Sequence, residues 1–241
     1  LAAALAASGK RVGLLDADIY GPSQGALLGI PEGTRPDVNN ELLQPLMAHG
    51  VVCMSMGFVT SERTPAIWRG PMASGALQQL LTQTNWGELD FLIVDMPPGT
   101  GDIQLTLAQK VPLTGAVIVT TPQDIALLDA RKGIEMFRRV AVPVIGIVEN
   151  MSIHVCSNCG HEEAIFGQGG GKAVAGDYET ELLGQLPLTL KLREQSDVGT
   201  PIVISDPDAV TSVTIREVAD KVQTFVEKNV AKAPVINIFN D

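Results

Sequence analysis

Asp90-Phe91-Leu92-Ile93-Val94-Asp95-Met96-Pro97-Pro98-Gly99-Thr100-Gly101-Asp102 is the stretch on which the interpretation of this sequence depends. Its apolar run, Phe91 to Val94, predicts a strand buried on both faces, as parallel strands are. Asp95 then stands at the carboxyl end, where open α/β sheets bind ligands. The Pro-Pro-Gly-Thr-Gly segment predicts a shaped loop, followed by a helix that starts near Asp102. An acid before a glycine loop is typical of a magnesium–phosphate site; the plainer alternative is that Asp95 caps a turn.

A second apolar run, Val12-Gly13-Leu14-Leu15, is likewise followed by acidic residues, Asp16 and Asp18. Two parallel strands of one sheet would bring Asp16, Asp18 and Asp95 to the same edge. Convergent carboxylates are unfavourable unless a cation or a catalytic role accounts for them. This edge is therefore the candidate active site.

Strand and helix patterns alternate over the rest of the 241 residues, without repeats or low-complexity linkers. This alternation predicts an α/β fold: one doubly wound, mostly parallel sheet flanked by helices, as a single domain over 1–241. The expected strands lie at 51–54, 115–122 (broken by its final proline), 142–150 and 182–188, and the expected helices at 1–8, 71–81, 124–140 and 208–227. Expected core positions on two of these helices are Met72, Ala76, Leu80, Leu81, Ile125, Leu128, Ile134 and Phe137.

Composition limits the possible partners and compartment. Lys+Arg 17 against Asp+Glu 27 gives a net charge of -10, which argues against a general nucleic-acid or anionic-membrane surface. No apolar run is long enough to span a bilayer. Cys53, Cys156 and Cys159 provide no disulfide framework, so we expect a reducing, cytoplasmic location.

Two glycine-rich segments resemble nucleotide motifs but depart from them. Gly99-Thr100-Gly101 begins like a dinucleotide fingerprint, but Gln104 stands where its last glycine belongs. The segment 167–172 resembles a phosphate loop, yet Phe166 replaces the first glycine and Ala173 the magnesium-binding hydroxyl residue. We expect 167–172 to be a connector into a short helix.

The pair in Cys156-Ser157-Asn158-Cys159-Gly160 has several interpretations from its residues alone. A thioredoxin-type pair usually opens a helix, which Gly160 and the following acids disfavour. A structural zinc site could add His154 and His161, although four ligands crowded on one short loop can hardly surround a metal tetrahedrally. A plain loop with unreactive thiols is the third possibility.

Several motifs, taken together and in this order, resemble the Mrp/ApbC/Nbp35 family of P-loop ATPases, the iron–sulfur cluster carriers related to MinD. The resemblance covers nearly the whole chain. It implies a deviant Walker A loop and a first strand before Leu1, so this chain departs from the family pattern by truncation. The motifs are 16–23, 68–72, 94–102, 120–124, 149–152 and 156–160.

The resemblance also implies roles for individual residues around ATP and Mg²⁺. Asp18 corresponds to the switch I acid that positions the attacking water, and Asp16 lies beside it. Asp95 corresponds to the Walker B acid, and Gly99 to the switch II backbone that senses the γ-phosphate. Asn150 corresponds to the residue that contacts adenine. The segments around Pro187 and at 193–197 correspond to the part of the family that closes over the base.

For the cysteines, the resemblance implies that Cys156 and Cys159, in a metal-binding loop near 151–166, supply two thiolates per subunit. A symmetric homodimer completes the set to four, which suits a [4Fe–4S] cluster. The implied function is an ATP-dependent carrier that transfers this cluster to apo iron–sulfur client proteins. Two alternatives remain: a zinc-stabilised ATPase acting as a regulator, and a MinD-like scaffold, which would usually carry a basic amphipathic C-terminal helix.

Overall fold

The structure is a computed structural model that describes residues 1–59, 70–156 and 158–229, and the chain divides into two units. Unit 1 comprises Leu1–Leu107 with Glu194–Ser205, and unit 2 comprises Ala108–Arg193 with the described residues from Asp206 on. Helices α5 and α8 each begin in one unit and end in the other. Among the helices of the described residues, none is both long and apolar enough to cross a bilayer.

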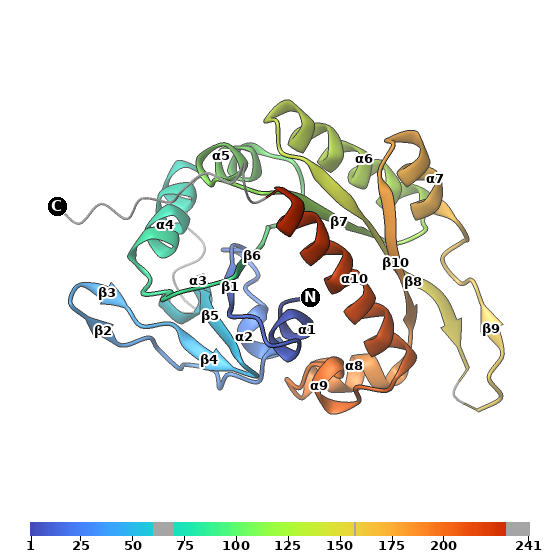
Figure 1. Cartoon of the computed structure of the whole chain (residues 1–241), viewed down its shortest axis with the longest axis horizontal. Coiled ribbons are helices and arrows are strands. Elements are labelled where there is room, and N and C mark those ends of the chain that lie inside the picture. Colours follow the sequence, from blue (N-terminus) through green and yellow to red (C-terminus); the bar gives the residue numbers. More distant parts are fainter. Residues whose placement is uncertain (60–69, 157, 230–241) are drawn as a thin grey trace. The chain divides into compact units, whose positions relative to one another are not determined.

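Unit 1 contains most of the N-terminal elements (Figure 1). They are α1 (Ala2–Ala7), β1 (Val12–Asp16), α2 (Gln24–Leu27), β2 (Val38–Asn39), β3 (Leu42–Leu43), β4 (Leu46–Ala48), β5 (Val51–Ser55), α3 (Met56–Val59), α4 (Gly70–Gln83), β6 (Phe91–Asp95), α5 (Asp102–Lys110) and α9 (Ile202–Ser205). Unit 2 contains β7 (Ala116–Thr120), α6 (Asp124–Arg139), β8 (Val144–Val155), β9 (Glu162–Glu163), α7 (Gly170–Asp177), β10 (Glu181–Leu188), α8 (Leu190–Asp197) and α10 (Val210–Asn229).

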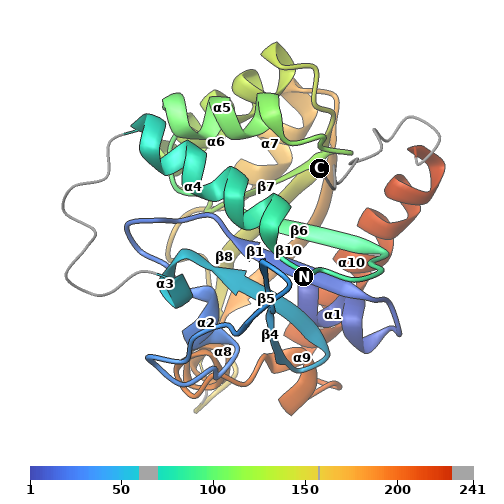
Figure 2. The ribbon, with the colours of Figure 1, turned by 90° about the vertical axis from the view of Figure 1, so that its left-hand side faces the viewer.

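The sheet of unit 1 has the strand order β4-β5-β1-β6 (Figure 2). Strand β1 pairs in parallel with both β5 and β6, and every residue of β1 is buried. Helix α1 buries Ala2–Leu5 and contacts β1 and β5. Strand β6 was expected to be buried on both faces, but all five of its residues are only half-buried, because it has a ladder partner on the β1 side alone within the described residues.

The sheet of unit 2 has the order β10-β8-β7, with all three strands parallel, and β9 returns antiparallel along the end of β8. Gly184 and Gln185 are neighbours on β10, so they face opposite sides of the sheet. A Cβ on Gly184 would meet Val218 of α10, whereas Gln185 bonds Glu149, whose carboxylate meets the start of α7. Helices α7 and α10 therefore cover opposite faces.

These elements confirm the predicted class, parallel strands flanked by helices, with two differences. The strands form two main sheets rather than one ladder, since neither β6 nor β7 has a second ladder partner within the described residues. Strand β8 also continues to Val155, five residues beyond the expected end. The single domain stays a prediction, and residues 68–69 and the tail after residue 233 lie outside the described ranges.

The predicted core positions of two helices were partly wrong. In α4, Met72 is 58% exposed and Ala76 half-buried, while Ala73 and Leu77 are buried with Leu80 and Leu81. In α6, Ile134 and Phe137 are buried as expected, but Ile125 and Leu128 are 73% and 53% exposed. Residue type alone misplaced the helix faces, because the buried positions include two alanines, Ala73 and Ala130, that were not among the expected core residues.

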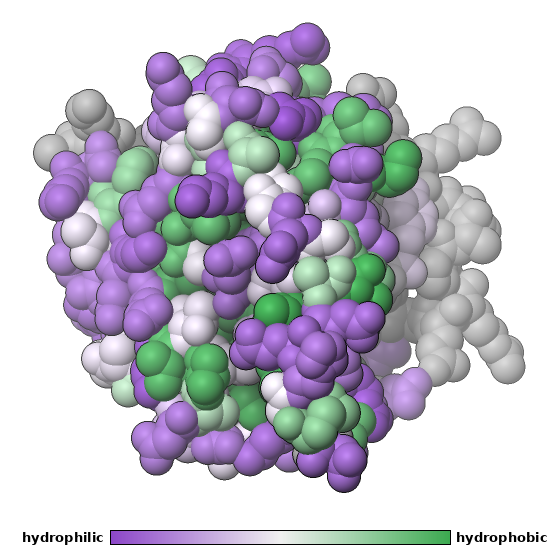
Figure 3. Space-filling view, turned by 90° about the vertical axis from the view of Figure 1, so that its right-hand side faces the viewer, coloured by the Kyte–Doolittle hydropathy of each residue, from purple (hydrophilic) through white to green (hydrophobic). Residues whose placement is uncertain are grey.

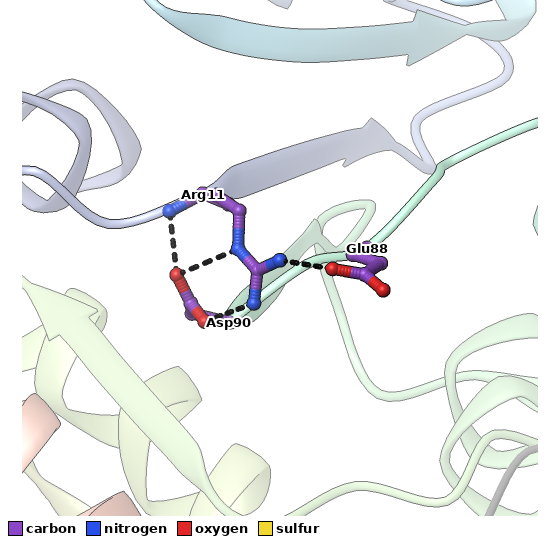
Figure 4. A network of polar contacts seen from close by, with 3 residues as sticks. All are labelled: Arg11, Glu88 and Asp90. Carbon is purple, nitrogen blue, oxygen red and sulfur yellow. Dashed lines mark hydrogen bonds and ion pairs between the residues drawn. The ribbon is translucent and has the colours of Figure 1, made fainter.

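An ionic clasp joins the amino ends of β1 and β6, at the opposite end of these strands from their acids (Figure 4). Arg11 donates from its backbone N and its guanidinium to Asp90, and from Nη1 to Glu88 at 2.6 Å. These bonds from Arg11 lower the pKa of Asp90 to about 2. The clasp holds the two strands together where the ladder begins.

Candidate functional site

Polar side chains gather where β5, β1 and β6 end. The ladder aligns Asp16 with Ser55 on one side and with Asp95 on the other. The backbone N–H of Ala17 then donates to the Asp95 carbonyl at 2.9 Å, so the two strands stay paired to their ends. The structure thus brings the predicted acids of both strands to one sheet edge.

Asp16 is fully buried and is surrounded by donors. Its Oδ2 accepts from the backbone N–H groups of Ser23 (3.0 Å) and Gln24 (3.1 Å) and from the Ser55 hydroxyl (3.1 Å), and its Oδ1 accepts from Asp18 N (3.2 Å). Burial raises the pKa of Asp16, and these hydrogen bonds oppose that shift. Asp16 therefore fixes the loop between β1 and α2.

Asp18 lies inside that loop and is only half-buried. Its Oδ1 accepts from the backbone N–H groups of Tyr20 and Gly21, each at 3.1 Å. Two such bonds to one carboxylate oxygen form a tight local turn, which sets the orientation of the side chain. Asp16 thus positions the loop, and the loop positions Asp18.

Asp95 is half-buried and receives a hydrogen bond that the sequence did not predict. Gln24, the first residue of α2, donates from Nε2 to Asp95 Oδ2 at 2.6 Å. Burial raises the pKa of Asp95, and the nearby Asp16 carboxylate raises it further. A four-residue helix has too little periodicity to be recognised in a sequence, so nothing marked Gln24 in advance.

The loop after β6 is shaped by a glycine and a buried amide. Gly99 has a φ of +94°, a left-handed conformation that favours glycine. Gln104, a buried residue of α5, donates from Nε2 to the Pro98 carbonyl at 2.5 Å. The loop is therefore held to the helix that follows, and the predicted position of Gly99 directly after the Asp95 strand is retained.

A magnesium ion suits this edge by the chemistry of its oxygen donors. No group of three His, Cys, Asp or Glu side chains in the described ranges lies close enough to hold a metal ion unaided. Mg²⁺ in phosphate sites uses one or two carboxylates together with phosphate oxygens and water. Burial and the Asp16 carboxylate both make the charge on Asp95 unfavourable, and a bound cation would offset that cost.

Unit 2 holds the other predicted residues on β8 and β10. Asn150 is half-buried, and its Oδ1 accepts from Met151 N at 3.0 Å. The ladder pairs Asn150 with Leu186 and next pairs His154 with Leu188, so the register is interrupted between these pairs. Pro187 lies in this interruption, where its missing N–H costs no ladder bond.

A buried carboxylate beside Asn150 was not assigned a role from the sequence. Glu149 is 1% exposed and accepts from Gly171 N and from Gln185 Nε2, both at 2.6 Å. These bonds connect β8 to the first turn of α7 and to β10. A Cβ on Gly171 would lie 3.0 Å from the Glu149 carboxylate, so the helix approaches closely because this position is glycine.

The cysteine pair lies in the turn between β8 and β9. Cys156 N donates to His161 O at 2.9 Å, and Gly160 N donates to Cys156 O at 2.8 Å, which closes the turn. Cys159 is exposed and Cys156 half-buried, whereas Cys53 is buried with its pKa raised to about 12, mainly by that burial. Hydrogen bonds from the backbone N–H groups of Asn158 and Cys159 lower the pKa of Cys156. These bonds favour the thiolate form of Cys156. Nearby, His154 Nδ1 lies 3.3 Å from the Leu188 carbonyl oxygen.

Hydrophilic and hydrophobic side chains alternate over the surface in Figure 3, where the hydrophobic ones lie in small groups. Among the described residues, the candidate site residues fall into two sets, one in each unit. Asp16, Asp18, Asp95 and Gly99 lie in unit 1, and Asn150, Pro187, Cys156 and Cys159 lie in unit 2.

Comparison with known proteins gives relatives over most of the chain. An iron–sulfur cluster carrier protein from Pseudomonas fragi is 61% identical over 91% of this chain and 77% of its own length. A protein of the same description from Escherichia coli (strain K12) is 57% identical over 92% of this chain and 60% of its own. The iron–sulfur cluster transfer protein NUBPL of Mus musculus is 50% identical, again over 92% of this chain and 70% of its own. The chain thus spans between about three fifths and three quarters of these relatives.

Solved structures agree with this relationship. A nucleotide-binding protein from Archaeoglobus fulgidus, in complex with ADP and with cobalt found in it, has a TM-score of 0.74 at 36% identity, over 86% of this chain and 80% of its own. The cell division ATPase MinD of Pyrococcus furiosus has a TM-score of 0.69 at 18% identity, over 92% of this chain and 90% of its own, and shows the fold alone. A sequence model of the ParA family, described as NUBPL iron-transfer P-loop NTPase, matches residues 1–223. The chain belongs to this ParA/NUBPL family of iron-transfer P-loop NTPases.

Proposed function

We propose that this protein hydrolyses ATP and carries a [4Fe–4S] cluster, shared between two copies of the chain, to apo iron–sulfur proteins. The observation that carries the proposal is the Cys156–Cys159 turn between β8 and β9, in which Cys159 is exposed and Cys156 half-buried. Family membership and the names of the relatives support a role in iron–sulfur transfer. The free state of the three cysteines supports a reducing compartment, for which we propose the cytoplasm.

For hydrolysis, we propose that Asp18 orients the water that attacks the γ-phosphorus. The new P–O bond forms as the bond to the β–γ bridging oxygen breaks, giving ADP and phosphate, and one water proton is released. Asp95 would hold Mg²⁺, which neutralises the charge on the β- and γ-phosphate oxygens. Asp16, with four donors around its carboxylate, would act by positioning the Asp18 loop.

For substrate binding, Gly99 would offer its backbone N–H to the γ-phosphate, since a left-handed glycine lets the chain approach closely. Asn150 would contact adenine through its side-chain amide, and the Pro187 segment of β10 would lie against the base. The ADP-bound relative from Archaeoglobus fulgidus supports nucleotide binding by this fold.

For the cargo, two thiolates from Cys156 and Cys159 in each of two copies give the four that a [4Fe–4S] cluster takes. An exposed turn on a β-hairpin can meet its symmetry mate across a two-fold axis. It can also pass a shared cluster to an acceptor. The zinc alternative would recruit His154 and His161, but no such group of three or more ligands forms in the described residues.

The test is anaerobic iron and sulfide analysis of variants, with the mass measured in solution. We expect one cluster per dimer, loss of the cluster in Cys156→Ala and Cys159→Ala, and retention of ATPase activity in both. His154→Ala, His161→Ala and Cys53→Ser serve as matched controls and keep the cluster. Stoichiometric zinc without sulfide, lost in the two histidine variants, would contradict the carrier function.

A further inference from the structure

The side chain of Gln24 holds one oxygen of the Asp95 carboxylate. The bond from Gln24 Nε2 to Asp95 Oδ2 measures 2.6 Å and joins residues 71 positions apart. Both residues are half-buried, so water competes only partly for this bond. Hydrogen bonds to an ionised carboxylate are about twice as strong as neutral ones.

The start of α2 is fixed by Asp16. The backbone N–H groups of Ser23 and Gln24 both donate to Asp16 Oδ2, at 3.0 and 3.1 Å. Asp16 is in register with Asp95 on the neighbouring strand. Gln24 is therefore bonded by its backbone to one acid and by its side chain to the other.

The end of α2 is also fixed, by close contact between two backbones. A Cβ on Gly199 would lie 2.3 Å from the Gly29 Cα and 2.8 Å from the Ala26 carbonyl oxygen. The Gly199 carbonyl in turn lies 3.0 Å from His49 Nε2. With both ends held, the short helix has little freedom to carry the Gln24 amide away from Asp95.

We infer that Gln24 is a positioning residue for Asp95. With Oδ2 held by the Gln24 amide, Oδ1 would be left for the magnesium ion that binds with the nucleotide. This inference rests on the proposed function, because it assigns a role at the same ATP site, and it adds a residue that is neither a phosphate nor a metal ligand.

The experiment replaces Gln24 by Met, which has the same length and no donor, and by Asn, which keeps the amide on a shorter side chain. The matched control is Gln44→Met, because half-buried Gln44 also makes side-chain hydrogen bonds, to Leu42 O and from Asn85, away from the acids. All variants are made in the protein together with any residues that its gene encodes before Leu1. Three quantities are measured: the Mg²⁺ dependence of ATPase activity, Mn²⁺ binding by electron paramagnetic resonance in the presence of ADP, and the thermal midpoint.

Both Gln24 variants are expected to raise the half-saturating Mg²⁺ concentration and the Mn²⁺ dissociation constant by about tenfold, the effect of one charge-assisted hydrogen bond. The KM for ATP at saturating Mg²⁺ should stay unchanged, and the thermal midpoint should fall no more than in Gln44→Met. A purely structural role would lower activity with the folded fraction and leave the Mn²⁺ constant unchanged.

The possible failures are distinguishable. If Asp95→Asn abolishes Mn²⁺ binding while Gln24→Met leaves it unchanged, the role of Gln24 is wrong and the proposed ATP site stands. If the parent protein shows neither Mg²⁺-dependent hydrolysis nor Mn²⁺ binding with ADP, the proposed function fails, and the inference about Gln24 fails with it.

Discussion

Asp16 and Asp95 are direct partners in the parallel ladder of β1 and β6, yet their carboxylates have different surroundings. Oδ2 of Asp16 accepts three hydrogen bonds, whereas Oδ2 of Asp95 accepts one, from a side chain. One acid is therefore committed to structure, and the other can serve a ligand.

Asp16→Asn should reduce the free energy of unfolding. The NH2 group of the asparagine would face N–H and O–H groups that now donate to the Asp16 carboxylate. We expect a loss of about 1–3 kcal/mol, the cost of leaving a buried polar group unsatisfied. Chemical denaturation measures it. Turnover per folded molecule should fall as well, since the Asp18 loop loses its anchor; an unchanged unfolding curve would contradict this assignment.

Asp95→Asn should instead leave stability unchanged or raise it. Burial and the Asp16 charge raise the pKa of Asp95, so its charge costs more in the folded protein than in the unfolded chain. Removing that charge relieves the cost, while Mg²⁺-dependent ATP hydrolysis should fall by at least about tenfold. Thermal unfolding and ATPase assays on the same preparation test both statements, and a loss of stability equal to that of Asp16→Asn would refute them.

Asp18→Asn should abolish most ATP hydrolysis and leave nucleotide binding largely intact. Asn keeps an oxygen that can accept from Tyr20 and Gly21, so the turn should survive. The loss then reflects the charge that orients the attacking water. Equilibrium ADP binding and single-turnover hydrolysis separate the two effects; normal turnover would show that Asp18 is only a turn residue.

Glu149→Ala should destabilise the protein by about 2–5 kcal/mol, because the Gly171 N–H and the Gln185 amide lose a buried acceptor. Glu163→Ala is the matched control, since Glu163 is an exposed residue of β9. It should change the free energy of unfolding by less than about 0.5 kcal/mol. Equal effects of the two substitutions would show that the buried carboxylate contributes little.

The Arg11 clasp should make stability depend on pH in the acid range. The pKa of Asp90 falls to about 2 in the folded protein, below its ordinary value of about 4. The stabilisation is therefore complete above about pH 4 and is lost as the pH falls through 2. The difference in thermal midpoint between the parent and Asp90→Asn should be present at pH 7 and disappear as the pH falls below 2. Glu88→Gln, at the more exposed end of the clasp, should show a smaller difference.

The acids at the strand ends could be predicted from sequence, because a short apolar run followed by Asp identifies both the strand and its carboxyl end. The role of Gln24 could not be predicted, since it depends on a four-residue helix and on a partner 71 positions away. The continuation of β8 past Asn150 was missed because polar residues interrupt the apolar run there. Glu149 lies in the motif 149–152, but only the fold shows that Gln185 and Gly171 donate to it.

The length of β8 has a mechanical consequence. Asn150 lies within this strand and Cys156 directly follows it, so at about 3.3 Å per residue they are at most about 20 Å apart along one backbone. A nucleotide at Asn150 and a cluster at Cys156 would therefore be connected by one short stretch of strand. The ladder between β8 and β10 is interrupted directly after Asn150, where Met151 has a φ of +55°, so a rotation at this residue would move both thiols together.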